Sequence, residues 1–172
     1  IEAQFPHELT SDQVTTLAEI KRDMEATKPM DRLLCGDVGY GKTELMVRAA
    51  LKALENYKQV AILVPTTILA EQHLKTFVQR LKDSPYRIKC LNRFVSKPDQ
   101  KKIVKELKQG LCDCVIGTQR LLSKDVIFSD LGLVIVDEEQ RFGVRYKEAL
   151  KLLCQTVDAL YVSATPIPRT LY

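Results

Sequence analysis

The chain has 172 residues, of which 45% are hydrophobic and 28% charged, with a net charge of +4. These values are ordinary for one folded domain with a substantial core. No apolar run reaches the length of a membrane span, and the N-terminus lacks the basic start and apolar stretch of a signal peptide. We therefore expect a cytoplasmic protein without membrane contact. Because the chain starts at Ile1 and stops just after a proline-interrupted run, we also expect it to be part of a longer protein.

The five cysteines do not form a metal-binding pattern. The only close pair, Cys112 and Cys114, has a C-x-C spacing that is not typical of zinc sites, and the chain has only two histidines, His7 and His73. Four of the cysteines lie in or beside apolar runs, which favours buried free thiols in a reducing compartment.

Positive charge is concentrated in one segment. Residues 82–108 carry nine Lys or Arg against three acidic residues, a net +6, so the rest of the chain sums to −2. Such a segment can follow nucleic-acid phosphates, but a solvated helix face explains the charge equally well.

Short apolar runs rich in β-formers alternate with longer helical patterns. The strand-like runs cover 32–36, 59–64, 87–92, 113–117, 132–137 and 157–163, and the helical patterns cover roughly 11–26, 42–56, 67–82, 98–109 and 144–154. Most of the strand-like runs are continuously apolar, which is typical of strands buried on both faces of a parallel sheet. The sequence predicts one three-layer α/β domain, residues 1–172, with a mainly parallel sheet.

A glycine-rich stretch, "GDVGYGKT", lies between the first predicted strand and the helix that follows it. It matches G-x-x-x-x-G-K-[ST], in which backbone N–H groups and a helix N-terminus hold phosphates, Lys42 reaches the β- and γ-phosphates, and the Thr43 hydroxyl holds Mg²⁺. A plain strand-to-helix turn would not need the lysine and threonine. The predicted nucleotide-binding residues here are Gly36, Asp37, Val38, Gly39, Tyr40, Gly41, Lys42, Thr43 and Glu44.

An acidic pair follows the buried run "GLVIVD", at the end of a strand where parallel α/β sheets bind ligands. We expect Asp137 to hold Mg²⁺ and Glu138 to polarise the attacking water. Acidic residues are also common at helix N-termini, which is the alternative explanation when the pair is taken alone.

Five motifs in order, "GDVGYGKT", "VPTTILAEQH", "GTQRLL", "VDEEQRFG" and "SATPIPRT", resemble motifs I, Ia, Ib, II and III of the superfamily 2 helicases and translocases. The matches extend over nearly the whole chain. The resemblance implies the first of two RecA-like lobes of an ATP-driven motor, and it places Gln140 among the catalytic residues.

The resemblance also assigns a DNA-facing set and a coupling pair. Ser163 and Thr165 would link the Asp137–Gln140 loop to the DNA side, although hydroxyls after a strand also cap turns. Simple alternatives remain for the DNA set too, since threonines cap helices and an exposed arginine is commonly just surface. The residues expected to contact the DNA backbone are Thr66, Thr67, Arg93, Thr118, Gln119 and Arg120.

Upstream, "FPHELTSDQ" is similar to the family's adenine-reading motif, with Gln13 contacting the adenine edge and Phe5 packing near the base. A competing explanation is local. Thr10 and Gln13 have the T-x-x-Q spacing of a capping box for the helix that follows.

Longer stretches such as "MDRLLCGDVGYGKTE" and "LNRF" most resemble the family of bacterial transcription-repair coupling factors, with RecG-type fork-remodelling translocases as the alternative. The resemblance implies translocation on double-stranded DNA, with RNA polymerase and excision-repair proteins as partners of other parts of the protein. The D-E-E-Q of this chain differs from the D-E-Q-H usual in the alternative group. Because the family's arginine finger lies on the second lobe, we expect this lobe alone to turn over ATP slowly.

The two interpretations of Gln13 make different predictions. If Gln13 reads adenine, Gln13→Ala abolishes the preference for ATP over GTP; if it only caps a helix, the preference stays and only stability falls. Competition binding of the two nucleotides, with thermal unfolding measured alongside, distinguishes them.

Overall fold

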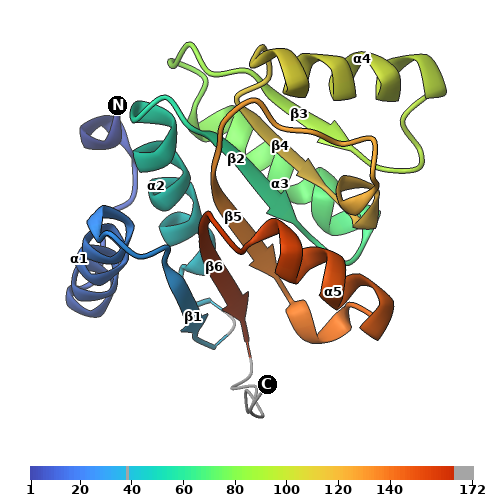
Figure 1. Ribbon diagram of the computed structural model, residues 1–172. Coiled ribbons are helices and arrows are strands. Elements are labelled where there is room, and N and C mark those ends of the chain that lie inside the picture. The colour runs from blue at the N-terminus through green and yellow to red at the C-terminus, as the bar shows by residue number, and fades with distance from the viewer. Residues whose placement is uncertain (38, 165–172) are drawn as a thin grey trace.

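The computed structural model describes residues 1–37 and 39–164. In these residues six strands form one sheet in the order β1-β6-β5-β2-β4-β3, and every neighbouring pair is parallel (Figure 1). The carboxyl ends of all the strands therefore lie at the same edge of the sheet. The strands are β1 (Asp31–Cys35), β2 (Gln59–Leu63), β3 (Ile88–Leu91), β4 (Cys114–Gly117), β5 (Leu131–Asp137) and β6 (Asp158–Ser163).

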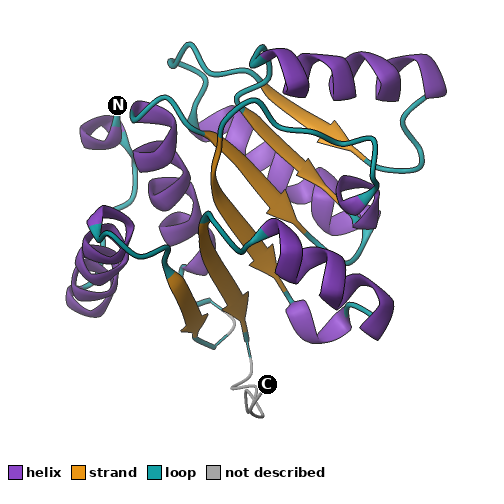
Figure 2. Cartoon of the chain, viewed as in Figure 1, coloured by secondary structure: helices purple, strands orange, loops and turns teal. Residues whose placement is uncertain are grey.

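The described residues also form five α-helices and three short 3₁₀ helices; η1 and α1 precede β1, and the others lie between strands (Figure 2). None of these helices is both long and apolar enough to cross a membrane. The predicted strands and α-helices are confirmed, with bounds within two residues of those expected; the 3₁₀ turns are too short to show a periodicity. The helices are α1 (Ser11–Glu25), α2 (Lys42–Glu55), α3 (Thr67–Arg80), α4 (Lys97–Gln109) and α5 (Val144–Leu153), with η1 (Glu2–Gln4), η2 (Gln119–Leu122) and η3 (Glu139–Arg141).

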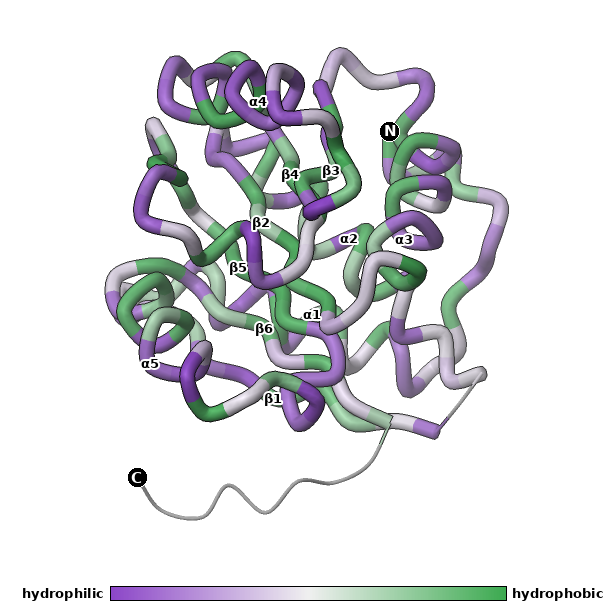
Figure 3. Tube along the Cα trace, turned by 90° about the vertical axis from the view of Figure 1, so that its right-hand side faces the viewer, coloured by the Kyte–Doolittle hydropathy of each residue, from purple (hydrophilic) through white to green (hydrophobic). Residues whose placement is uncertain are grey.

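The sheet is the middle of three layers. Helices α1, α2 and α3 pack on one face, and α4, η2 and α5 pack on the other (Figure 1). In β5, Leu133 and Ile135 contribute to the first core and Val134 and Val136 to the second, and all four side chains have no exposed surface. A strand covered on both faces needs apolar residues at every position, which explains the continuous apolar run. Figure 3 shows the hydrophobic residues concentrated in the central strands.

Helix α4 illustrates how local sequence signals set an element's ends. Its N-cap Ser96 accepts a hydrogen bond from Asp99 N at 3.3 Å, and Pro98 occupies the first turn, where its missing N–H is not needed. The helix ends at Gly110, whose φ of +72° is the left-handed conformation of a helix C-cap.

The expectation of free thiols is confirmed, since all five cysteines are without a disulfide, but only Cys112 and Cys114 are buried; Cys90 and Cys154 are half-buried and Cys35 is exposed. Burial raises the pKa of Cys112 to about 12, and it also raises the pKa of the fully buried Cys114. Thiols held in the protonated form in this way are poor nucleophiles.

The end of β4 provides a test of packing. A Cβ on Gly117 would lie 2.2 Å from the backbone oxygen of Leu91 on β3, so Gly117→Ala must push two paired strands apart. We expect a loss of about 1–3 kcal/mol in the free energy of unfolding, measured by urea denaturation. The control is Gly143→Ala at the start of α5, where a Cβ meets nothing within 4 Å. Equal stability of the two variants would contradict the expectation.

Candidate nucleotide-binding site

The loop between β1 and α2 has a backbone that requires glycine. Gly39 and Gly41 have φ angles of +89° and +82°, and a Cβ on Gly41 would lie 2.2 Å from Gln13 Nε2. Gly41 is also the N-cap of the 14-residue helix α2, and no side chain caps that end. The first N–H groups of α2 therefore lack a side-chain acceptor, which is the arrangement that binds phosphate at helix N-termini.

Two further hydrogen bonds hold the shape of the phosphate loop. Lys42 Nζ donates a hydrogen bond to Gly36 O at 2.7 Å, so its ammonium group folds back over the loop. Tyr40 N donates to the carbonyl of the exposed Asp37 at 3.0 Å. Val38 lies outside the described residues.

The acidic pair lies at the carboxyl end of β5. Asp137 is the last residue of the strand, and Glu138 turns the chain sharply with a left-handed φ of +55°. Such a conformation is uncommon for a residue other than glycine and is frequently found at functional sites. The amide of the exposed Gln140 donates a hydrogen bond to the Glu138 carboxylate, which fixes the direction of that carboxylate.

Strand β6 joins these two loops through its main chain. Gly36 N donates to Ser163 O at 3.3 Å, and Glu138 N donates to Val162 O at 2.9 Å. The end of β6 therefore contacts both the phosphate loop and the acidic turn, which is the position expected of a coupling element. Thr165, the other predicted coupling residue, lies outside the described residues.

The residues present fit a Mg²⁺ ion bound together with a nucleotide. Thr43, in the first turn of α2, and Asp137, at the end of β5, carry hard oxygen atoms of the kind that Mg²⁺ prefers. The strands that precede them, β1 and β5, are separated only by β6, so these two strands lie about 10 Å apart. Among the described residues no group of three or more His, Cys, Asp or Glu side chains could hold a metal. Mg²⁺ does not need such a group, because it commonly takes one or two protein carboxylates and completes its shell with water and phosphate.

Gln13 has two structural partners. Its Oε1 accepts from Thr10 N at 2.9 Å, completing the capping box of α1, and its Nε2 donates to Tyr40 O in the phosphate loop at 2.5 Å. The capping explanation is thus confirmed, but the second bond also places Gln13 against the nucleotide loop. Its adenine contact stays a prediction.

Phe5 and Glu44 belong to a cluster that the sequence did not reveal. The Phe5 ring lies under the guanidinium groups of Arg48 and Arg80, at 5.2 and 4.4 Å from its centroid. The largely buried Glu44 carboxylate accepts from Arg48 Nε at 2.8 Å and from Arg80 Nη2 at 2.7 Å. The i,i+4 spacing of Glu44 and Arg48 was a usable signal, but nothing in the sequence indicated Arg80.

The predicted DNA-facing residues all follow β2, β3 or β4, at the same edge of the sheet. Thr66 caps α3 by accepting from Leu69 N at 3.2 Å, and Thr67 opens that helix. Arg93 is exposed, and its guanidinium lies 4.9 Å from the ring centroid of Phe94. These residues therefore line the half of the edge that is not occupied by the phosphate loop.

The three candidates after β4 are less accessible. Thr118 is buried and Gln119 half-buried. Arg120 forms two hydrogen bonds of 2.8 Å with Asp125 and a third, also of 2.8 Å, with Gln100 on α4. A DNA contact by Arg120 would therefore have to compete with, or share, these bonds.

One contact at the candidate site is not predicted by the sequence. His73 on α3 lies with its Nε2 atom 2.8 Å from Asp137 Oδ2. In sequence the two residues are 64 positions apart, and His73 was considered only as a metal ligand and set aside. No local pattern indicates such a long-range pair.

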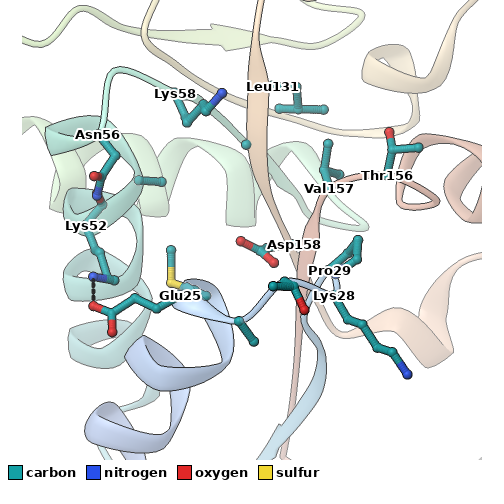
Figure 4. A pocket seen from close by; sticks show the side chains of 15 residues that line it. Glu25, Lys28, Pro29, Lys52, Asn56, Lys58, Leu131, Thr156, Val157 and Asp158 are labelled. Atoms are coloured by element: carbon teal, nitrogen blue, oxygen red, sulfur yellow. Dashed lines mark hydrogen bonds and ion pairs between the residues drawn. The ribbon is translucent and has the colours of Figure 1, made fainter.

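A surface pocket lies at the opposite edge of the sheet, near the starts of β1, β5 and β6 (Figure 4). Two of its three lysines are paired, Lys52 with Glu25 at 2.7 Å and Lys58 with Asp130 at 3.0 Å. The pocket is therefore remote from the phosphate loop and is not the nucleotide site.

Fold and site together define a P-loop nucleotide-binding domain. The family model described as DEAD/DEAH box helicase matches residues 10–172. Over 171 residues the chain is 57% identical to the transcription-repair-coupling factor of Bacillus subtilis (strain 168) and 58% identical to that of Staphylococcus aureus (strain USA300). Each match covers 99% of this chain but only 14% and 15% of those proteins.

Among solved structures, RecG bound to a three-way DNA junction superposes with a TM-score of 0.84 at 41% identity, over 98% of this chain and 22% of that one. The chain belongs to the DEAD/DEAH box helicase family. It spans about one-seventh of the length of the two curated relatives.

The Glu44 cluster generates a pH-dependent prediction. Burial raises the pKa of Glu44, but hydrogen bonds from Arg80 and Arg48 outweigh this effect and lower the pKa below its ordinary 4.5. A lowered pKa in the folded state adds stability above pH 4.5 that disappears as the pH falls further. Glu44→Gln should lose about 2 kcal/mol at pH 7, the value typical of a hydrogen bond to a charged group.

The difference in the free energy of unfolding between Glu44→Gln and wild type should shrink below pH 4.5. Urea unfolding at a series of pH values measures it. Glu55→Gln, at the exposed end of the same helix, is the control. A difference that is constant with pH would contradict an ionic role for Glu44.

Proposed function

We propose that this chain is the ATP-binding lobe of a cytoplasmic, ATP-dependent translocase on double-stranded DNA, which displaces stalled RNA polymerase and couples transcription to nucleotide excision repair. The observation that carries the proposal is the identity of 57–58% over 99% of the chain to two transcription-repair-coupling factors. The geometry supports it, because nucleotide-facing and DNA-facing candidates share one edge of the sheet. Partner contacts would belong to other parts of the protein, since the chain covers a small share of these relatives.

Each site residue then has a chemical task. Lys42 neutralises phosphate charge, and the N–H groups of the loop and of α2 orient the phosphates. Thr43 and Asp137 would hold Mg²⁺, which supplies charge neutralisation on the phosphate oxygens. Glu138, directed by Gln140, orients the attacking water and accepts its proton. A lobe that has these groups but lacks an arginine from a second lobe hydrolyses ATP slowly.

DNA would bind along the β2, β4 and β3 half of the edge. Hydroxyls and N–H groups at the start of α3, together with Arg93, are suited to phosphate oxygens, and such contacts carry no sequence information. Binding of this kind weakens steeply with salt. A translocase that moves along DNA of any sequence needs contacts of this kind, which do not depend on the identity of the bases.

The alternative function is a fork-remodelling translocase, and the similarity to RecG bound to a three-way DNA junction favours it. The two candidates share the chemistry proposed for this lobe and differ in what the motor acts on. An assay must therefore offer both substrates.

Glu138→Gln in the full-length protein tests the proposal. The variant keeps the size of the side chain but cannot accept the proton, so we expect ATP hydrolysis to fall about 100-fold or more with nucleotide binding retained. Displacement of a stalled RNA polymerase from duplex DNA should be lost. Glu139→Gln, one residue further along, is the matched control and should retain both activities.

If the wild-type protein leaves the polymerase in place but hydrolyses ATP on branched DNA, the fork-remodelling function replaces the proposed one. If Glu138→Gln hydrolyses ATP normally, the role of Glu138 is wrong.

A further inference from the structure

The contact between His73 and Asp137 joins two elements with different tasks. Asp137 ends β5 at the edge of the sheet that carries the phosphate loop, whereas His73 belongs to α3, the helix that follows β2 and begins with the threonines predicted to contact DNA. Only 10% of the His73 side chain and 14% of the Asp137 side chain are exposed. The pair is therefore largely shielded from water, where a hydrogen bond is stronger than at the surface.

The chemistry of the pair sets the direction of the bond. A carboxylate can only accept, so the proton lies on His73 Nε2, which donates to Asp137 Oδ2. The bond restricts rotation of the carboxylate about its last torsion, which is otherwise broad. The bond occupies Oδ2 of Asp137, so Oδ1 is the carboxylate oxygen that His73 does not contact.

Helix α3 is a rigid support for the imidazole. Ala70 and Phe77 are fully buried against the sheet, three residues before and four residues after His73. At the two ends of the helix, Thr66 caps the first turn and Arg80 is paired with Glu44 on α2. Groups that orient a ligand act best from elements held in this way.

We propose that His73 is a positioning residue that orients Asp137 for Mg²⁺, and that it does so through the Nε2–H···Oδ2 hydrogen bond. The proposal rests on the proposed function, because it requires Asp137 to be the Mg²⁺ ligand. Groups that hydrogen-bond a metal-binding carboxylate commonly change metal affinity 10–100-fold when they are removed. His73 itself does not touch the metal or the nucleotide.

The test is a Mg²⁺ titration of the affinity for a fluorescent ATP analogue, in the full-length protein. His73→Leu removes the donor, and we expect the Mg²⁺ concentration at half-saturation to rise about tenfold or more. His73→Gln places an amide N–H near the position of Nε2 and should restore most of the affinity. Gln72→Ala, exposed on the same helix, is the control. Affinity for the analogue in EDTA should be equal in all variants.

Two results would overturn the proposal: a normal half-saturation in His73→Leu, or equal damage in His73→Gln and His73→Leu. The second result would mean that the imidazole acts by packing. If thermal unfolding shows that His73→Leu does not fold, His73→Met replaces it in the same comparison.

Asp137→Asn separates this proposal from the proposed function. If nucleotide binding depends on Mg²⁺ in wild type but not in Asp137→Asn, Asp137 is the metal ligand. The His73 variants then decide whether His73 positions it. If Mg²⁺ has no effect on wild-type nucleotide binding, the metal role of Asp137 fails, and the positioning role of His73 fails with it.

Discussion

Parallel pairing of β5 with β6 on one side and β2 on the other is the constraint on which the rest of this domain depends. Because every strand runs in the same direction, every loop that follows a strand emerges at one edge, and residues distant in sequence become neighbours there. The same pairing requires helices on both faces, since a buried strand has no polar side. The apolar residues of β5 and the functional groups at its end are thus two consequences of one arrangement.

The order of the strands divides that edge into two halves. Strands β1, β6 and β5 end in the phosphate loop, the main-chain acceptors of β6 and the acidic turn, whereas β2, β4 and β3 end in the candidate DNA contacts. Two polar contacts of α3 reach across the division, one from His73 to Asp137 and one from Arg80 to Glu44. Both contacts tie α3 to elements on the other side of the division, β5 and α2.

Several polar residues hold the fold and border the site at once. Gln13 caps its own helix and also bonds the phosphate loop, and Glu44 joins two helices from the first turn of α2. The Phe5 ring packs against the guanidinium groups of Arg48 and Arg80, which joins the N-terminal segment to α2 and α3. At Gln13 and Glu44, hydrogen bonds that stabilise the fold therefore lie next to the candidate nucleotide site.

The elements and the phosphate loop could be predicted from the sequence, because both depend on signals within a few residues: apolar runs for β2 and β5, the capping box at Thr10, and glycines at 39 and 41 where φ is positive. The acidic pair was also predicted from its place after a strand, whereas the DNA-facing set came from the resemblance of the motifs to those of the helicases and stays a prediction. Which side chains meet depends on the tertiary packing. The pairs His73–Asp137, Arg80–Glu44 and Gln13–Tyr40 are 64, 36 and 27 positions apart, and no periodicity along the chain encodes contacts that exist only once the helices pack on the sheet.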